Sequence, residues 1–323
     1  MFKSIIIGCG KIAGLYDDMN NSFVYSHARA YQNNSLIDVV CYVDNDESRA
    51  KTLANKYCSN HYSSDYKEAI KLYKPDVVSV CTPDSTHFEV VNTILDLEYL
   101  PRIIFLEKPA CRTSEEFDTL IMKSKIKDVK IVVNHSRRFD NLHQNLKHKI
   151  FLNTFGQLIK IDAIYYGGWN HNGVHTIDTL NFLFDDEVVI NNIIDQFLSP
   201  YQGDFNFDFK CFFKNKKTPI YLTTMNEENY QLFEFDLKFE KARIRIEDFG
   251  QRIVYEEKEI NEMNENILVV KESPLDISKI SPMQNAINII VSSLKDTTEI
   301  IGYQLSDISK TMNLIWEGNQ WVK

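Results

Sequence analysis

The sequence predicts an α/β protein with an N-terminal doubly wound parallel sheet and a C-terminal α+β domain built on an open, mostly antiparallel sheet. Two observations carry this prediction. Over roughly the first 135 residues, short β-branched runs alternate with helical segments, as in βαβ units with right-handed crossovers. After Arg138, runs of period-two alternation appear, which indicate strands with one buried face. The predicted domains are residues 1–136 and 137–323.

The expected strands of the first domain are apolar and largely β-branched, because strands of a parallel sheet are buried on both faces. They cover Ile5–Ile7, Val39–Val43, Val77–Cys81, Ile103–Leu106 and Ile131–Val133. Three of the intervening helices are expected to begin at the N-cap residues Asp46, Ser64 and Ser114, whose side chains can accept hydrogen bonds from backbone amides.

In the second domain, alternating phenylalanines predict strands over residues 205–211 and 233–239. Amphipathic helices are expected over residues 282–294 and 304–316. One face of the sheet should pack on helices. The other face is expected to carry enough aromatic surface for self-association, so a homodimer or homotetramer through this sheet is predicted.

Composition argues against several classes of protein. The net charge of −9 and the absence of a basic block disfavour a nucleic-acid or anionic-membrane partner, since either would need a basic face. No apolar run reaches the length of a membrane span, and the first strand begins too close to Met1 for a signal peptide, so a cytoplasmic protein is expected. The six cysteines lack C-x-x-C spacing and are expected to be reduced.

The first strand runs directly into a glycine-rich turn at residues 8–14 that is expected to open a helix. In a Rossmann domain such a turn brings backbone N–H groups to a pyrophosphate. The candidate cofactor-binding residues of this turn are Gly8, Gly10, Lys11, Ile12 and Ala13. Asp44 ends the second strand, where a carboxylate binds a ribose 2′-hydroxyl and would repel a 2′-phosphate, so NAD is favoured and NADP stays possible. The alternative is a tight turn with a solvated Asp44.

The strand Ile103–Leu106 ends in Glu107-Lys108-Pro109. Ligands bind outside the carboxyl ends of parallel strands, so Lys108 would stand at the nicotinamide and exchange a proton with a carbinol during hydride transfer. A lysine with its ordinary pKa is almost fully protonated at neutral pH, so burial or a neighbouring cation must lower that pKa. Glu107 is expected to point away from Lys108. The alternative is a lysine in a surface ion pair.

His171 and His175 are four residues apart and share a face if the segment is helical. A metal site would need a third ligand such as Asp178, and no H-E-x-x-H signature is present, so none is predicted. His175 is instead expected to bind a substrate hydroxyl or relay a proton, with Asp178 orienting it or contacting the ligand. Trp169 could stack on a sugar ring or fill the domain junction. Arg138 could bind an anionic substrate group or form interdomain salt bridges.

Six motifs carry a family resemblance: GCGKIAG at 8–14, VDNDESRA at 43–50, VCTPDSTH at 80–87, EKP at 107–109, VVNHSRRF at 132–139 and GVHTIDTLNFLF at 173–184. In these motifs, which extend over nearly the whole chain, it resembles the Gfo/Idh/MocA oxidoreductases. Their glucose–fructose oxidoreductase and inositol dehydrogenase relatives bind NAD(P) and oxidise or reduce sugars and polyols.

The resemblance implies roles for particular residues. The cofactor-binding positions are Thr82, Pro83, His87, Glu107 and Lys108. Lys108 is implied to be the catalytic acid/base, with a cis peptide bond to Pro109, and His175 is implied to face the substrate. The segment GWNHNGVH resembles relatives that act on sugars or nucleotide sugars in bacterial surface-glycan pathways, and the substrate-binding candidates in it include His171 and Asn172. The chain departs from the sugar-dehydrogenase pattern at His171, where relatives with a Lys-Asp-His triad carry Asp.

Together these expectations predict an NAD(P)-dependent oxidoreductase that moves a hydride between nicotinamide and the carbinol of a sugar, polyol or nucleotide sugar. The alternative from another class is a catalytically silent NAD-binding sensor or regulatory protein of the same fold. The retained Lys108 and His175 count against it, and His171 keeps it open. A methyltransferase would leave the EKP and H-x-x-D motifs without a role.

Overall fold

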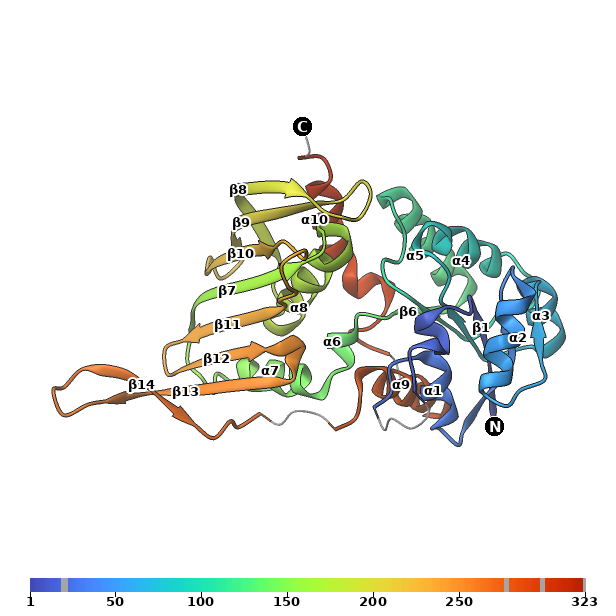
Figure 1. The fold of residues 1–323 in the computed structure, drawn as a ribbon, viewed down its shortest axis with the longest axis horizontal. Coiled ribbons are helices and arrows are strands. Elements are labelled where there is room, and N and C mark those ends of the chain that lie inside the picture. The colour runs from blue at the N-terminus through green and yellow to red at the C-terminus, as the bar shows by residue number, and fades with distance from the viewer. Residues whose placement is uncertain (19–22, 276–278, 297–299, 322–323) are drawn as a thin grey trace. The chain divides into compact units, whose positions relative to one another are not determined.

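The computed structural model describes residues 1–18, 23–275, 279–296 and 300–321. The chain divides into two compact units, drawn in Figure 1. Unit 1 comprises Met1–Asp140 and Ile280–Ser309, and unit 2 comprises Asn141–Lys279 and Lys310–Lys323. This partition differs from a single division at residue 137, because a late segment of the chain returns to unit 1.

Unit 1 is built on a six-stranded parallel sheet with the strand order β3-β2-β1-β4-β5-β6. Its strands are β1 (Phe2–Ile7), β2 (Ile37–Val43), β3 (Tyr62–Ser63), β4 (Val77–Val80), β5 (Ile103–Leu106) and β6 (Lys130–Val133). Every residue of β4 and β5 is buried, which is why these strands appear as continuous apolar runs in the sequence. The strand order reverses direction beside β1, so the predicted doubly wound sheet is confirmed.

The regular helices of unit 1 are α1 (His27–Gln32), α2 (Glu47–Lys56), α3 (Tyr66–Tyr73), α4 (His87–Leu95), α5 (Ser114–Lys127), α6 (Ser136–Phe139) and α9 (Pro282–Asp296). Short helical turns cover η1 (Lys11–Leu15), η2 (Asp84–Thr86) and η5 (Leu305–Ile308). Asp46 caps α2 as predicted. The other two predicted N-caps are wrong by one residue, since Asp65 caps α3 and Thr113 caps α5. Each of these side chains accepts a hydrogen bond from a backbone amide in the first turn.

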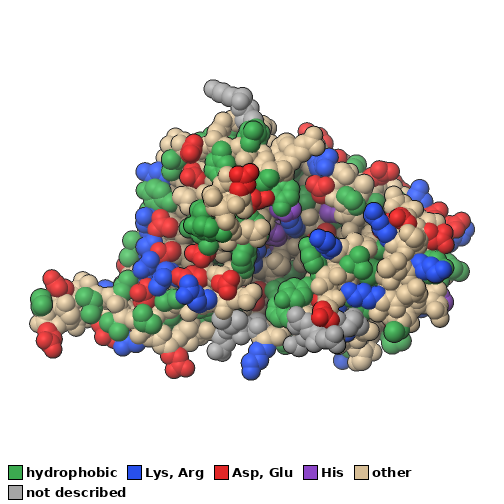
Figure 2. Space-filling model, viewed as in Figure 1, with side chains coloured by type: hydrophobic (Ala, Val, Ile, Leu, Met, Phe, Trp, Pro, Cys, Tyr) green, Lys and Arg blue, Asp and Glu red, His purple; other side chains and the backbone are tan. Residues whose placement is uncertain are grey.

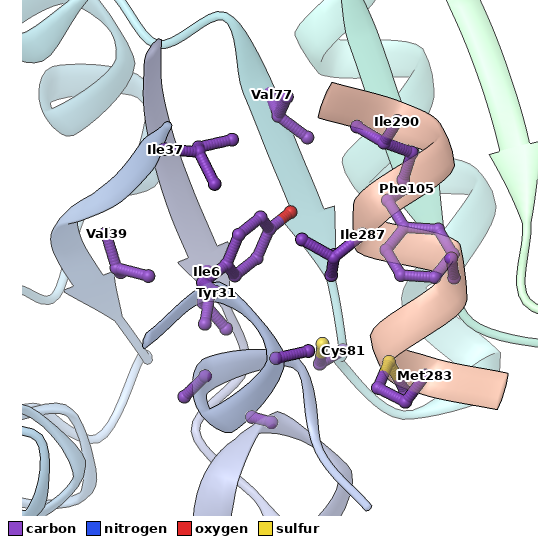
Figure 3. Packing of buried hydrophobic residues seen from close by; sticks show 14 of the residues in the cluster. Ile6, Tyr31, Ile37, Val39, Val77, Cys81, Phe105, Met283, Ile287 and Ile290 are labelled. Carbon is purple, nitrogen blue, oxygen red and sulfur yellow. The ribbon is translucent and has the colours of Figure 1, made fainter. Parts of the chain in front are cut away.

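Helix α9 packs in unit 1 against α1 and α6, although it lies far from them in sequence. Met283, Ile287 and Ile290 project from α9 into a core that also contains Tyr31 and Phe105, as Figure 3 shows. Fully burying an aliphatic side chain of this size contributes roughly 1.5–3 kcal/mol. This burial places Ile280–Ser309 in unit 1. The sequence predicts the amphipathic helix, but its partner depends on the tertiary fold.

Unit 2 is built on an eight-stranded sheet with the order β14-β13-β12-β11-β7-β10-β9-β8. Its strands are β7 (Leu158–Tyr166), β8 (Val188–Leu198), β9 (Phe205–Phe213), β10 (Pro219–Met225), β11 (Glu234–Phe239), β12 (Ala242–Glu247), β13 (Arg252–Ile260) and β14 (Asn266–Lys271). The pairs are antiparallel except for β7 with β10, which confirms a mostly antiparallel sheet.

The helices of unit 2 are α7 (Asn141–Phe151) and α8 (Val174–Phe184), together with α10 (Ser309–Gly318), and the shorter turns are η3 (Trp169–Gly173) and η4 (Asp248–Gly250). The single helix predicted over residues 304–316 is instead the turn η5 followed by α10. Alternate residues of the central strands are buried, including Ile161 and Tyr165 in β7 and Phe235 and Leu237 in β11.

The opposite face of these strands carries ion pairs where the sequence predicts aromatic surface. Asp162 of β7 accepts hydrogen bonds from Lys160 and Lys238, and Asp236 of β11 lies 2.8 Å from Arg243. Acidic and basic side chains are likewise interspersed on the molecular face drawn in Figure 2. Self-association through this sheet stays a prediction, and a partner copy there would have to accommodate these charges.

Candidate functional site

The glycine-rich turn after β1 packs directly on the end of β4. Gly8 has a φ of +88°, a conformation that favours glycine, and a Cβ there would lie 2.6 Å from the backbone carbonyl of Cys81. At Gly10, by contrast, a Cβ would meet nothing within 4 Å. The expected helix is only the five-residue π-helical turn η1. The turn therefore holds its backbone rigidly and faces open space at Gly10, as a pyrophosphate cradle requires.

The side chains of this turn divide between the core and the surface. Ala13 is fully buried and Ile12 packs against the same hydrophobic cluster. Lys11 is exposed, with its Nζ 5.9 Å from the centroid of the Tyr16 ring. Ile12 and Ala13 therefore serve the predicted cofactor site by shaping the backbone, whereas Lys11 is the side chain of the three that can reach a phosphate.

Asp44 follows β2 and is tied to the glycine turn. Its Oδ2 accepts a hydrogen bond from the Cys9 amide at 2.8 Å, and its Oδ1 accepts one from the Asp46 amide at 3.0 Å. Each carboxylate oxygen keeps a second acceptor site for a ribose hydroxyl. Arg49 is exposed and lies 3.4 Å from Asp46. The carboxylate of Asp44 is thus fixed where the sequence predicts the ribose site.

His87 lies between two loops at the carboxyl ends of β4 and β5. Its Nε2 is 2.8 Å from the carbonyl oxygen of Thr82, and its Nδ1 is 2.6 Å from that of Pro109. The prediction that His87 binds the cofactor is corrected, because both ring nitrogens face backbone carbonyls and the side chain braces the loops. The Oγ1 of Thr82 is buried and has no hydrogen-bond partner among the described residues. Pro83, next to it, is the N-cap residue of η2.

Lys108 stands at the carboxyl end of β5, and its peptide bond to Pro109 is cis, as the resemblance implies. Burial lowers the pKa of Lys108, and the positive charge of Arg137 lowers it further. The carboxylates of Glu107 and Asp84 act in the opposite direction, but the pKa remains below the ordinary value. Both causes that the sequence argument required, burial and a neighbouring cation, are present.

The side chain of Glu107 belongs to a buried polar chain within unit 1, that is, a series of polar side chains joined by hydrogen bonds. Its Oε1 accepts hydrogen bonds from His27 Nε2 and Asn134 Nδ2, each at 2.7 Å. The Nδ1 of His27 lies 3.1 Å from Ser79 Oγ, which is 2.8 Å from the Tyr31 hydroxyl. Burial acts to raise the pKa of Glu107, but the hydrogen bond and charge of His27 bring it below its ordinary value. Glu107 therefore has a structural role in unit 1 through its Oε1 atom, and its contact with the cofactor stays a prediction.

Sequence reasoning missed His27, Ser79, Tyr31 and Asn134. A signal existed for the first of them, because a histidine four residues before a tyrosine shares one face of the helix that begins at residue 27. No pattern pairs that face with Glu107, which lies 80 residues further along the chain. The pairing depends on the neighbouring positions of β1, β4 and β5 in the sheet.

Arg138 is 5% exposed and serves unit 1 as a structural residue. Its guanidinium nitrogens donate to the backbone carbonyls of Gly302 at 2.6 Å and Asp307 at 3.3 Å. These bonds hold the segment that follows α9. Backbone oxygens of its own unit thus take two of its donors, and the burial of the side chain argues against the predicted contact of Arg138 with an anionic substrate.

Trp169 is fully buried in unit 2. Its Nε1 donates to the Ile315 carbonyl at 3.1 Å, and its ring lies against Phe209 and Tyr165 at centroid distances of 5.0 and 6.3 Å. The predicted stacking of Trp169 on a sugar ring is corrected, because the indole is part of the hydrophobic core.

His171 and Asn172 lie in the turn η3, which Asp204 holds in place. The Asp204 carboxylate accepts hydrogen bonds from the backbone amides of Asn170 and His171 at 3.1 and 3.2 Å. The exposed His171 ring stacks on Tyr201 with a centroid distance of 4.1 Å. Their contact with substrate stays a prediction. Asp204, which sequence reasoning missed, orders the turn before α8.

His175 and Asp178 lie in the first turns of α8 in unit 2. Asp178 is 1% exposed, and its Oδ1 accepts a hydrogen bond from Thr311 Oγ1 at 3.1 Å. This bond ties α8 to α10 and removes Asp178 from the exposed candidates for ligand contact. His175 is partly exposed at the start of α8, and its role toward substrate stays a prediction.

Two structural findings concern a membrane-spanning helix and a metal site. None of the described helices is long and apolar enough to cross a membrane. Within the described ranges, no group of three or more His, Cys, Asp or Glu side chains is arranged to hold a metal ion.

Unit 1 has the parts of a dinucleotide site. The open space at Gly10 admits a pyrophosphate, Asp44 offers carboxylate oxygens to a ribose, and Thr82 has a buried hydroxyl without a partner in the described structure. These features lie at the carboxyl ends of neighbouring strands of one doubly wound sheet, where such folds bind ligands. Fold and site together define a dinucleotide-binding domain of the Rossmann type.

Comparison with known families agrees. Residues 2–135 match the family GFO_IDH_MocA, described as "Oxidoreductase family, NAD-binding Rossmann fold". Residues 2–135 of the chain are therefore similar to the NAD-binding Rossmann domain of the Gfo/Idh/MocA oxidoreductases, which confirms the resemblance and the predicted cofactor class.

Individual proteins show how far this similarity extends along the chain. D-glucoside 3-dehydrogenase of Escherichia coli is 27% identical over 153 residues, which are 47% of this chain and 40% of that protein. Among solved structures, a dehydrogenase of Clostridium difficile has a TM-score of 0.74 at 18% identity and covers 99% of both chains. UDP-N-acetylglucosamine 3-dehydrogenase of Acidithiobacillus ferrooxidans has a TM-score of 0.72 at 15% identity, covering 98% of this chain and 96% of that one. These structures show the same fold in both units.

Replacing Asp44 with Asn should shift dinucleotide preference toward NADP. A carboxylate about 4 Å from a 2′-phosphate repels it by roughly 4 kcal/mol at an intermediate dielectric, so the ratio of the NADP to NAD dissociation constants should fall by about tenfold or more. Titration calorimetry with both dinucleotides measures the ratio. Asp38→Asn, on the exposed side of the same strand, is the control. An unchanged ratio in Asp44→Asn would remove Asp44 from the ribose site.

Proposed function

We propose that this chain transfers a hydride between the nicotinamide of NAD(P) and a carbinol carbon of a sugar-like substrate. One observation carries the proposal: Lys108 stands at the carboxyl end of β5, in the dinucleotide-binding unit, with its pKa lowered by burial and by Arg137. A lysine of lowered pKa is neutral more often than an ordinary lysine, so it can better take the proton that a carbinol oxidation releases and return it in the reverse reaction.

The bound dinucleotide would supply the hydride acceptor or donor. Gly8 and Gly10 would hold its pyrophosphate, and Asp44 its adenosine ribose. The side-chain amine of Lys108 would take the hydroxyl proton during oxidation and return it during reduction. His175, at the start of α8 in unit 2, is proposed to bind a substrate hydroxyl or relay the proton onward.

The substrate class is proposed from chemistry and from the names of relatives. D-glucoside 3-dehydrogenase and UDP-N-acetylglucosamine 3-dehydrogenase, by their names, both oxidise a carbinol of a sugar ring. A sugar, polyol or nucleotide sugar is therefore proposed here, with a role in bacterial surface-glycan biosynthesis as the finer assignment. NAD is proposed as the preferred cofactor because Asp44 is ionisable and its carboxylate is fixed at the ribose position. A cytoplasmic homodimer or homotetramer is part of the same proposal.

The testing experiment supplies panels of sugars, polyols and nucleotide sugars with NAD or NADH and follows nicotinamide absorbance in both directions. Turnover with a member of one panel supports the proposal and names the substrate class. Silence across all panels, in a protein shown by calorimetry to bind NAD, would contradict the proposal for these substrates and favour the sensor or regulatory alternative.

The pH dependence of turnover should report on Lys108. Oxidation needs the neutral amine, so kcat/KM for oxidation should rise with pH through the Lys108 pKa, below the ordinary range of lysine. Reduction needs the ammonium form and should show the opposite slope. Arg137→Gln removes a positive charge that lowers this pKa, so the oxidation profile should move to higher pH. Arg102→Gln is the control, because Arg102 is an exposed arginine of the same unit that lies just before β5, at the opposite end of the strand from Lys108. A profile that moves equally in both variants would remove Arg137 from this role.

A further inference from the structure

Asn134 carries an unused hydrogen-bond acceptor at the carboxyl end of the parallel sheet. It directly follows β6, is 6% exposed, and its backbone amide donates to the Leu106 carbonyl at 2.8 Å. The Oδ1 atom is buried and has no hydrogen-bond partner in the described part of the chain. An unsatisfied buried polar atom costs about 1–3 kcal/mol, so a native structure that retains one usually has a reason for it.

The orientation of the Asn134 amide is set by chemistry. Its Nδ2 lies 2.7 Å from Glu107 Oε1. An ionised carboxylate only accepts hydrogen bonds, so the NH₂ group of Asn134 must face Glu107. The Oδ1 atom then occupies the other terminal position of the amide and points away from Glu107. The lowered pKa of Glu107 keeps that carboxylate ionised.

Glu107 is itself fixed from the opposite side. His27 Nε2 donates to the same Oε1 atom at 2.7 Å, and the His27 ring lies 4.6 Å from the ring of Phe105. Through Ser79, the chain continues to the hydroxyl of Tyr31 in the core of unit 1. The amide of Asn134 is therefore the end of a buried polar chain, and its oxygen is a pre-oriented acceptor at the carboxyl end of the sheet, next to the strand that Lys108 follows.

The strand order identifies the part of the dinucleotide that reaches this acceptor. Asp44 ends β2 and the glycine turn ends β1, so the adenosine and pyrophosphate occupy that half of the sheet. The nicotinamide half then extends over the ends of β4, β5 and β6, where Thr82, Lys108 and Asn134 stand. Neighbouring strands are about 4.8 Å apart, so these three positions span roughly 10 Å. The carboxamide of nicotinamide carries an N–H donor of the kind that Asn134 Oδ1 lacks among the described residues.

We propose that Asn134 Oδ1 accepts a hydrogen bond from the carboxamide N–H of the bound nicotinamide. In this assignment Glu107 and His27 are positioning residues that act through the Asn134 amide. The bond would fix the rotation of the nicotinamide ring relative to Lys108 and would satisfy an acceptor that is otherwise buried without a partner. The inference concerns dinucleotide binding, so it does not depend on turnover.

The test compares NAD with its 3-acetylpyridine analogue, in which a methyl group replaces the carboxamide NH₂ and removes the donor. Titration calorimetry without substrate should show that the wild-type protein binds NAD about 2- to 12-fold more tightly than the analogue, the range expected for one hydrogen bond. In Asn134→Ala the two affinities should become equal. A purely structural role for Asn134 would weaken both ligands together and leave their ratio unchanged.

Asn92→Ala is the matched control. Asn92 lies in α4 of the same unit and also has a buried Oδ1 without a partner among the described residues, but it is not at a strand end. This variant should keep the wild-type ratio. The wild-type protein alone can overturn the proposal, if it binds NAD and the analogue with equal affinity. This test does not require Asn134→Ala to fold. A ratio that persists in folded Asn134→Ala would also overturn it.

Discussion

Lys108→Ala should reduce turnover by about 10²- to 10⁴-fold while NAD binding is largely kept. The amine is the group proposed to exchange the carbinol proton, and its lowered pKa has no evident structural purpose at the end of β5. The dinucleotide is proposed to be bound chiefly by the glycine turn and Asp44, which the substitution leaves intact. The measurement is kcat in both directions, with NAD affinity determined by calorimetry on the same preparation.

Lys71→Ala is the control for this prediction. Lys71 is exposed on α3 of the same unit, so its removal changes the net charge equally without touching the strand ends. Turnover of this variant should match that of the wild type. If Lys108→Ala retained wild-type turnover, the acid/base assignment would be wrong, whereas equal loss of NAD binding and turnover would make Lys108 a cofactor-binding residue.

Gly8→Ala should mainly lower the stability of the protein, whereas Gly10→Ala should mainly weaken NAD binding. A Cβ at Gly8 would lie 2.6 Å from the Cys81 carbonyl group and would require a positive φ, so this variant should lose about 2–5 kcal/mol of unfolding free energy. A Cβ at Gly10 meets nothing within 4 Å. Gly10→Ala should therefore fold normally but bind NAD about tenfold more weakly or worse, because the methyl group enters the pyrophosphate space.

Denaturant titration and NAD calorimetry on both variants distinguish the two roles, and each variant is the control for the other. Gly203→Ala adds a second control for binding alone, since its Cβ also meets nothing within 4 Å and it lies in unit 2. Its φ of +78° means that this variant should lose some stability. NAD affinity in that variant should not change. If Gly10→Ala bound NAD as tightly as the wild type, the pyrophosphate would have to lie elsewhere.

Local pattern was sufficient for much of unit 1. Strands buried on both faces must be apolar throughout, so β4 and β5 could be read from composition alone. The glycine turn and Asp44 were likewise found from their positions at strand ends. The short β3 was not predicted, because a two-residue strand has no periodicity to detect. The cap errors at Ser64 and Ser114 arose because adjacent side chains of similar chemistry compete for the same amides.

Local pattern was insufficient to predict which partner a polar or aromatic side chain contacts. Trp169 and Arg138 were suitable for substrate contact by residue type, yet the fold satisfies them with backbone carbonyls of Ile315 and Gly302. His87 was assigned to the cofactor by resemblance, and its ring instead joins two loops. A residue type states what a side chain can bind, and only packing decides which of the available partners is near.

The sequence by itself determined the two kinds of sheet, the dinucleotide turn, the carboxylate for the ribose and the lysine at the end of β5. These features follow from periodicity and from the rule that parallel strands present their carboxyl ends at one edge. The tertiary structure alone decided that α9 returns to unit 1, that Glu107 pairs with His27, and that Asn134 ends a buried polar chain. Such contacts join residues far apart in the chain, and their energy depends on burial and orientation, which exist only once the sheet and helices have packed.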